Sequence, residues 1–120
     1  MKENNVKNKS FAFAVRIVKL NQYQTKKKRE YVMAKQILRS GTAVGAMVRE
    51  AEHGQSKADF IHKFAIAQKE INETIYWLEL LKATDYIDEN YFNSLNMDAV
   101  ELIKIITAII KNTKRNLTNN

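Results

Sequence analysis

The chain contains no proline in its 120 residues and only three glycines. Proline ends or kinks a helix because it lacks a backbone N–H and its ring clashes with the preceding turn. Segments rich in Ala, Leu, Ile, Lys and Glu, all good helix formers, can therefore continue for many turns. A chain of this length forms one hydrophobic core. We predict one all-α domain over residues 1–120, with flexible ends at 1–9 and 117–120.

Apolar residues recur every three to four positions in four segments, which is the spacing of one buried helix face. Ser10 and Ser56 are the predicted N-caps of the first and third segments, because a serine hydroxyl accepts a hydrogen bond from the first turn. The links are short, so consecutive helices run antiparallel. The prediction is an antiparallel up-down-up-down four-helix bundle, with helices over about 10–24, 28–53, 57–84 and 89–115.

The second segment carries Gly41 and Gly45 on one face. A glycine inside a helix costs about 1 kcal/mol relative to alanine, so this pair indicates close packing against another helix. Gly54 is expected to stop this helix. The third and fourth segments show continuous apolar seams, and a bend is expected in the fourth near 94–96. The predicted core positions of these two segments are Phe60, Phe64, Ala67, Ile71, Thr74, Leu78, Leu81, Leu95, Ala99, Leu102, Ile106 and Ile109.

The net charge of +7 is unevenly distributed. Up to Arg39 there are eleven Lys or Arg against two acids, or +9, whereas the remainder carries −2. Part of the tract Lys26–Arg29 lies at the predicted N-terminus of the second helix. Positive charge there opposes the helix dipole, and a bound phosphate would relieve that conflict. Two interpretations fit this charge pattern: a basic nucleic-acid surface, flanked by Tyr23 and Tyr31 as stacking candidates, or a solvated loop. The candidate residues are Arg16, Lys19, Lys26, Lys27, Lys28, Arg29 and Lys35.

Arginine and carboxylate side chains on half-buried faces set the register between helices or subunits. The predicted structural ion pairs join Arg39 and Arg49 to Glu50, Glu70 and Glu73. Two helices carry more apolar surface than a monomeric bundle needs, which predicts a homo-oligomer. Its predicted interface comprises Ile66, Trp77, Leu80, Val100, Ile103 and Ile110.

Catalytic and metal sites are not expected. There is no cysteine, there are two histidines, and no glycine-rich loop could hold a phosphate. Glu50-x-x-His53 and Asp59-x-x-His62 have the spacing of a di-iron motif, but the other two helices offer no matching ligands. We therefore predict no metal, no cofactor and no enzymatic activity. A polar N-terminus without a signal sequence, and no apolar run that could span a membrane, predict a cytoplasmic protein.

Three blocks carry a resemblance: QILRSGTAVGAMVREA at 36–51, SKADF at 56–60 and IAQKEINETIYWL at 66–78. They resemble the four-helix-bundle proteins encoded in intervening sequences of bacterial 23S rRNA genes, a family similar to the accessory variability determinant of diversity-generating retroelements. One departure is Ala46-Met47, where the family usually has Ala-Asn. The resemblance implies a homopentamer with a central channel and an association with RNA or DNA. A scaffold that binds a protein partner, such as a reverse transcriptase, is the alternative.

Overall fold

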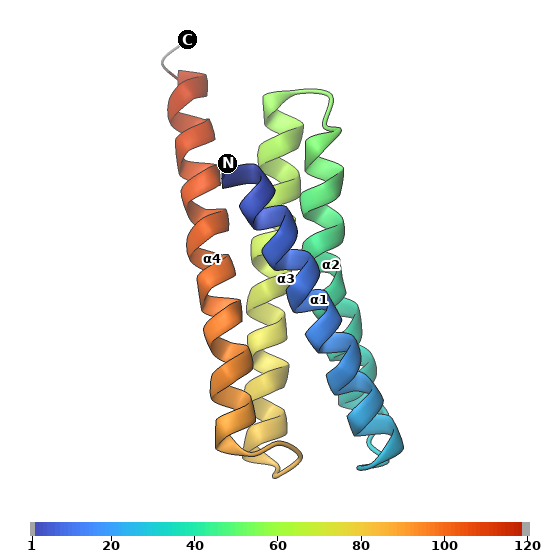
Figure 1. The fold of residues 1–120 in the computed structure, drawn as a ribbon. Coiled ribbons are helices and arrows are strands. Elements are labelled where there is room, and N and C mark those ends of the chain that lie inside the picture. The colour runs from blue at the N-terminus through green and yellow to red at the C-terminus, as the bar shows by residue number, and fades with distance from the viewer. Residues whose placement is uncertain (1, 119–120) are drawn as a thin grey trace.

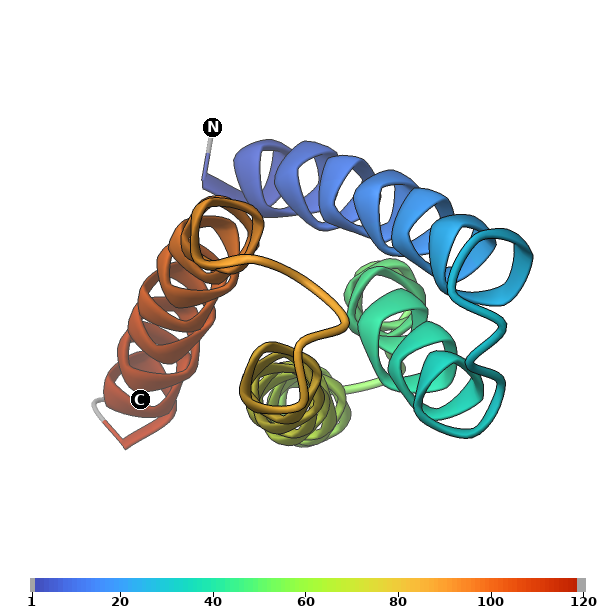
Figure 2. The same cartoon turned by 90° about the horizontal axis from the view of Figure 1, so that it is seen from below.

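Four long helices form the protein in the computed structural model, which describes residues 2–118, with side chains from 5 to 117. They are α1 (Lys2–Lys26), α2 (Val32–Glu52), α3 (Lys57–Ala83) and α4 (Glu89–Thr118). Each helix runs antiparallel to the one before it (Figure 1), and the bundle measures 53 × 22 × 21 Å. Seen from one end, α1 packs against α2, α2 against α3 and α3 against α4, while α1 and α4 meet along a smaller contact (Figure 2). The predicted all-α up-down-up-down bundle is confirmed.

The first helix begins at Lys2, so the predicted N-cap at Ser10 is wrong. Ser10 lies inside α1 and is buried, and its hydroxyl donates to the backbone carbonyl of Lys7 at 3.1 Å. Val6 explains the longer helix, because it is fully buried in the core one heptad before Phe13. The segment 1–9, expected to be flexible, is thus helical from Lys2 onward. Residues 1, 119 and 120, also expected to be flexible, lie outside the described part of the chain.

The second helix begins at Val32, four residues later than predicted. The backbone of Arg29 adopts a left-handed conformation with φ 54°, which ends any continuation from α1. The carboxylate of Glu30 then accepts hydrogen bonds from the backbone N–H groups of Val32 at 3.0 Å, Met33 at 2.9 Å and Ala34 at 2.8 Å. Glu30 therefore satisfies three N–H groups that a helix N-terminus otherwise leaves without partners.

Close packing at the glycines of α2 is confirmed, and α1 is the partner. A Cβ atom added to Gly41 would lie 2.7 Å from Ile17 Cγ1, which is too short for any real contact. At Gly45 the same atom would lie 3.4 Å from the backbone oxygen of Ser10. Gly54 follows the end of α2 as expected, but its φ is not positive.

The seams of α3 and α4 form the core as predicted, with the exception of Phe60, which is half-buried. Ser56 caps α3, since its hydroxyl accepts from the backbone N–H of Asp59 at 3.0 Å. Helix α4 continues without interruption through 94–96. One buried polar contact crosses the core: the hydroxyls of Ser40 and Thr74 lie 2.8 Å apart and join α2 to α3.

Candidate nucleic-acid interface

Several basic residues along the sides of the bundle are already paired with acids from other helices. Arg16 donates to Asp98 Oδ2 at 2.7 Å and to Ser94 Oγ at 2.9 Å, both on α4. Lys9 pairs with Glu101 at 3.1 Å, also on α4. Arg16 was predicted to belong to the nucleic-acid surface, but its side chain forms an ion pair that joins α1 to α4. Arg16 lies on the side of α1 that faces α4, so its guanidinium reaches Asp98.

The basic turn, by which we mean Lys26–Arg29, lies at the end of the bundle where α1 leads into α2 (Figure 1). All four side chains are exposed, and none has an ion-pair partner among the residues that the structure describes. Lys28 Nζ lies 6.0 Å from the ring centroid of Tyr23. Lys19 and Lys35 are exposed and also lack ion-pair partners in the described chain. Six of the seven predicted residues therefore present unneutralised charge, concentrated at one end of the bundle.

The sequence predicted that the basic turn would lie at the N-terminus of the second helix and attract a phosphate there. This electrostatic prediction is wrong. Lys26 belongs to the last turn of α1, where a positive charge is favourable. The N-terminus of α2 is occupied by the carboxylate of Glu30, which is largely buried. The chain's own carboxylate thus supplies the negative charge that a phosphate was expected to supply. A phosphate at the basic turn would contact side chains and not the helix N-terminus.

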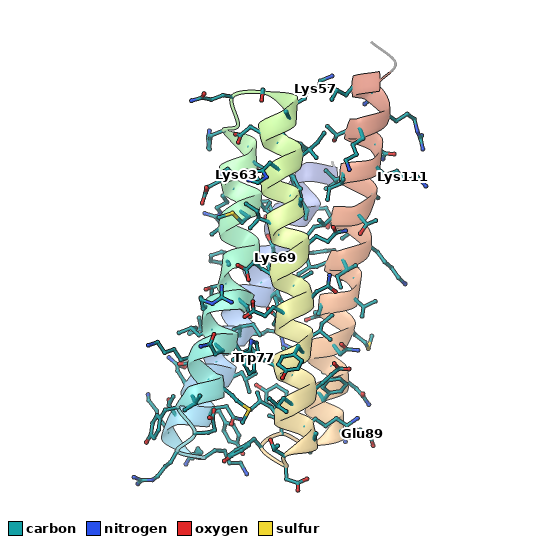
Figure 3. All side chains as sticks on the ribbon, turned by 180° about the vertical axis from the view of Figure 1, so that it is seen from behind. Lys57, Lys63, Lys69, Trp77, Glu89 and Lys111 are labelled. Carbon is teal, nitrogen blue, oxygen red and sulfur yellow. The ribbon has the colours of Figure 1, made fainter. Side chains whose placement is uncertain are left out.

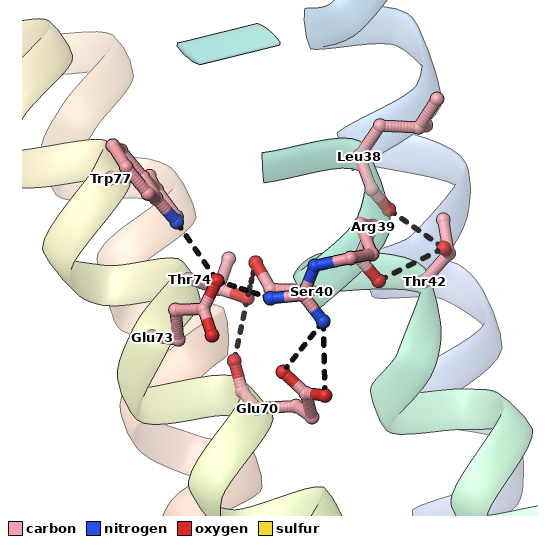
Figure 4. Close-up of polar contacts among 8 residues, drawn as sticks. All are labelled: Leu38, Arg39, Ser40, Thr42, Glu70, Glu73, Thr74 and Trp77. Atoms are coloured by element: carbon pink, nitrogen blue, oxygen red, sulfur yellow. Dashed lines mark hydrogen bonds and ion pairs between the residues drawn. The ribbon is translucent and has the colours of Figure 1, made fainter. Parts of the chain in front are cut away.

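Arg39 on α2 lies between two glutamates of α3, as the predicted ion pairs require (Figure 4). Its guanidinium contacts Glu70 at 3.1 Å and also Glu73, whose carboxylate accepts from the indole N–H of Trp77 at 3.1 Å. The hydrogen bond from Trp77, followed by that from Arg39, lowers the pKa of Glu73. The hydrogen bonds from Glu73 and then Glu70 raise the pKa of Arg39. The network is a charged link between α2 and α3.

The other two residues of the predicted ion-pair set have different partners. Arg49 lies over the ring of Phe11 on α1, with its guanidinium carbon 5.2 Å from the ring centroid. Glu50 pairs with Lys63 on α3 at 3.1 Å. Helical periodicity places these charges on exposed faces, but it does not predict which charges of two neighbouring helices lie close enough to pair.

The predicted oligomer interface is mostly half-buried within one chain. Trp77, Ile103 and Ile110 pack against the core, and Val100 is the most exposed of the set at 36 %. Ile66 and Leu80 are intermediate. A more exposed apolar row, outside this predicted set, lies on α1. It comprises Phe11, Val15 and Val18, whose exposed fractions are 55 %, 39 % and 38 %.

The acids and histidines of the possible di-iron motif do not gather into a metal-binding arrangement. Glu50, His53 and Asp59 line an open pocket at the α2–α3 end, together with the cations Arg49 and Lys63. Within the described chain no group of three or more His, Cys, Asp or Glu could hold a metal ion. Over the same residues, no helix has both the length and the apolar character needed to cross a membrane.

These features define an antiparallel four-helix bundle with paired charges along its sides and a cluster of unpaired cations at one end. Its sequence matches the 23S rRNA-intervening sequence protein family over residues 2–108. The chain therefore belongs to this family, as the three sequence blocks indicated.

A solved structure of high similarity supports the same assignment. It is a protein with unknown function from the S23 ribosomal protein family of Bacteroides thetaiotaomicron, with 56 % sequence identity and a TM-score of 0.92. The similarity covers 92 % of this chain and 99 % of that one. Comparison with curated proteins gave no match.

Proposed function

We propose that the protein is a non-enzymatic bundle that associates with RNA or DNA through the basic turn, together with Lys19 and Lys35. The observation that carries this proposal is the gathering of exposed, unpaired cations at one end of the bundle. Phosphate groups would replace the counterions around these side chains, which makes binding favourable and dependent on salt. The names of the family and of its solved relative refer to 23S rRNA and to a ribosomal protein family, which supports RNA as the first ligand to test.

A salt titration of RNA binding tests the proposal. The test variant replaces Lys26, Lys27, Lys28 and Arg29 with glutamine. We expect it to bind single-stranded RNA on the order of 100-fold more weakly at low salt, and to reduce the salt slope by about 3, because each lost phosphate contact removes about 0.7 from that slope.

A matched control removes four cations elsewhere. Lys57, Lys69, Lys104 and Lys111 are exposed on α3 and α4, and three of them are labelled in Figure 3. Replacing these four with glutamine changes the net charge equally, but we expect most RNA affinity to remain. Equal losses in the two variants would mean that only net charge matters, and unchanged binding in the first variant would overturn the assignment to the basic turn.

Protein contacts are the second candidate, favoured by the exposed row of Phe11, Val15 and Val18. This row would form an interface between copies of this chain, in a pentamer according to the resemblance noted above. The other possible partner is a different protein, such as the reverse transcriptase of the retroelement analogy. Light scattering of the wild type and of a Phe11→Ser, Val15→Ser variant tests the oligomer. A monomer mass for the wild type would rule out self-association through this row.

A further inference from the structure

A small pocket lies between the basic turn and the α3–α4 loop, and its volume is about 280 Å³. Both connections lie at the same end of the bundle (Figure 1). Tyr23 and Lys28 contribute from the α1 side, and the opposite side is formed by the loop and the start of α4. We call it the tyrosine pocket; its remaining lining residues are Asp85, Tyr86, Ile87, Asp88 and Tyr91.

The tyrosine pocket has a positively charged side and a negatively charged side. Asp85 and Asp88 line it on the loop side, and Lys28 with the rest of the basic turn lies on the other side. A ligand that is only anionic would be repelled by the two carboxylates, and one that is only cationic would be repelled by Lys26–Arg29. A nucleotide satisfies both regions, because it has an anionic phosphate at one end and neutral N–H donors on its base at the other.

The pocket also offers flat aromatic surface. Tyr23 lines the pocket and is 40 % exposed, with Lys28 Nζ 6.0 Å from its ring centroid. Tyr91 also lines the pocket and is half-buried, and this burial raises the pKa of its hydroxyl. Stacking of a base on an aromatic side chain is a recurrent way of holding single strands.

A buried polar side chain of α1 contacts the pocket wall. The side chain of Gln24 is fully buried, and its amide nitrogen donates to the backbone carbonyl of Tyr86 at 3.3 Å. Its side-chain oxygen has no hydrogen-bond partner among the described residues. Gln24 does not itself line the pocket, and its contact with Tyr86 joins α1 to the pocket wall.

We propose that the tyrosine pocket receives one unstacked base of a single-stranded nucleic acid whose phosphates contact Lys26–Arg29, with a preference for bases that carry an exocyclic amino group. The base stacks on Tyr23 and its amino group donates to Asp85. Asp88 already accepts from the backbone N–H of Tyr91 at 2.8 Å, so its main role is to begin α4. This inference rests on the proposed function and specifies which part of the nucleic acid is recognised.

Two short RNAs that differ at a single position test the inference. One has adenosine at that position, and the other has purine riboside, which lacks the amino group. We expect the wild type to bind the adenosine RNA roughly tenfold more tightly. Tyr23→Ala should weaken binding roughly tenfold through lost stacking, whereas Tyr23→Phe should retain it. Asp85→Gly should abolish the preference for adenosine; glycine suits the left-handed φ of 66° at this position, so the loop is kept.

Tyr76→Ala is the matched control, because Tyr76 lies on α3 away from the basic turn, is 54 % exposed and does not line the pocket. We expect it to bind both RNAs as the wild type does. Salt-dependent binding with equal affinity for the two RNAs would overturn the tyrosine pocket as a base site and leave the basic turn as the binding surface. Failure to bind either RNA at low salt would overturn both proposals. Thermal unfolding of each variant establishes that it is folded.

Discussion

The cations along the sides of the bundle and those at the basic turn are chemically alike but differ in what surrounds them. Lys9 and Arg16 face α4, where Glu101 and Asp98 lie within 3.1 and 2.7 Å. Lys26–Arg29 follow one another at the end of the bundle where the chain reverses (Figure 2), and none of them forms an ion pair with another described residue. The comparison teaches that an excess of positive charge in a sequence remains unpaired only where the fold brings no carboxylate within ion-pairing distance.

The largest stability effect is expected at Glu30, the carboxylate that separates the basic turn from α2. Glu30→Ala should lower the free energy of unfolding by about 2 kcal/mol, because three backbone N–H groups lose an ionised acceptor. Glu52→Ala is the control, since Glu52 makes only an exposed pair with Lys7 at 3.3 Å. Chemical denaturation measures both variants. Equal losses would show that Glu30 does not cap α2.

Asp98→Asn tests the comparison directly, because it releases Arg16 from its ion pair. If the absence of a nearby carboxylate is what makes a cation available, RNA affinity should rise by roughly fivefold and the salt slope by about 0.7. Glu79→Gln removes the same charge from an exposed residue of α3 that has no ion-pair partner in the described structure. A filter-binding titration that gave equal gains for the two variants would attribute the effect to net charge alone.

The pH dependence of stability provides a smaller test, at the Arg39 network. The pKa of Glu73 is lowered, chiefly by Trp77 and then by Arg39, so this carboxylate stabilises the fold above the ordinary glutamate pKa. That contribution is lost as the pH falls through the lowered pKa. Trp77→Phe should therefore lose less stability than the wild type between about pH 6 and about pH 3. Tyr76→Phe, an exposed neighbour, should follow the wild type in urea denaturation across this range.

The smallest effect is expected from a single pair on the side of the bundle. Lys9→Gln should change the free energy of unfolding by about 0.5 kcal/mol or less, because both partners are exposed to solvent. The side-chain exposures are 38 % for Lys9 and 51 % for Glu101. RNA affinity should not change measurably in the same variant. A loss as large as that of one basic-turn lysine would contradict the distinction between paired and unpaired cations.

The core was predictable because it depends on apolar periodicity. Residues such as Ile71 and Leu102 recur at helical spacing and are buried, and the gap at Gly41 is filled by Ile17. A periodic pattern read from the sequence alone is enough to identify such positions, since apolar residues at helical spacing lie on one face of a helix. The same pattern gave the number of helices and their antiparallel order.

The helix starts and the state of the charges were less predictable. The N-terminus of α2 is capped by Glu30, a residue type that sequence rules do not rank among the usual N-caps. The start of α1 depends on the burial of Val6 within a polar segment. The pairing of Arg16 with Asp98 depends on how α1 and α4 are rotated about their axes. Such features follow from tertiary packing, which local patterns do not contain.

The order of the helices around the core has a consequence for how the chain folds. Three of the four helix contacts join neighbours in sequence, and the contact between α1 and α4 is the smallest. A fold with mainly local contacts has a low contact order and loses little chain entropy before its contacts form, which places folding in the microsecond-to-millisecond range. The α1–α4 contact closes the longest loop, so helical hairpins should form first, and Arg16 should meet Asp98 late in folding.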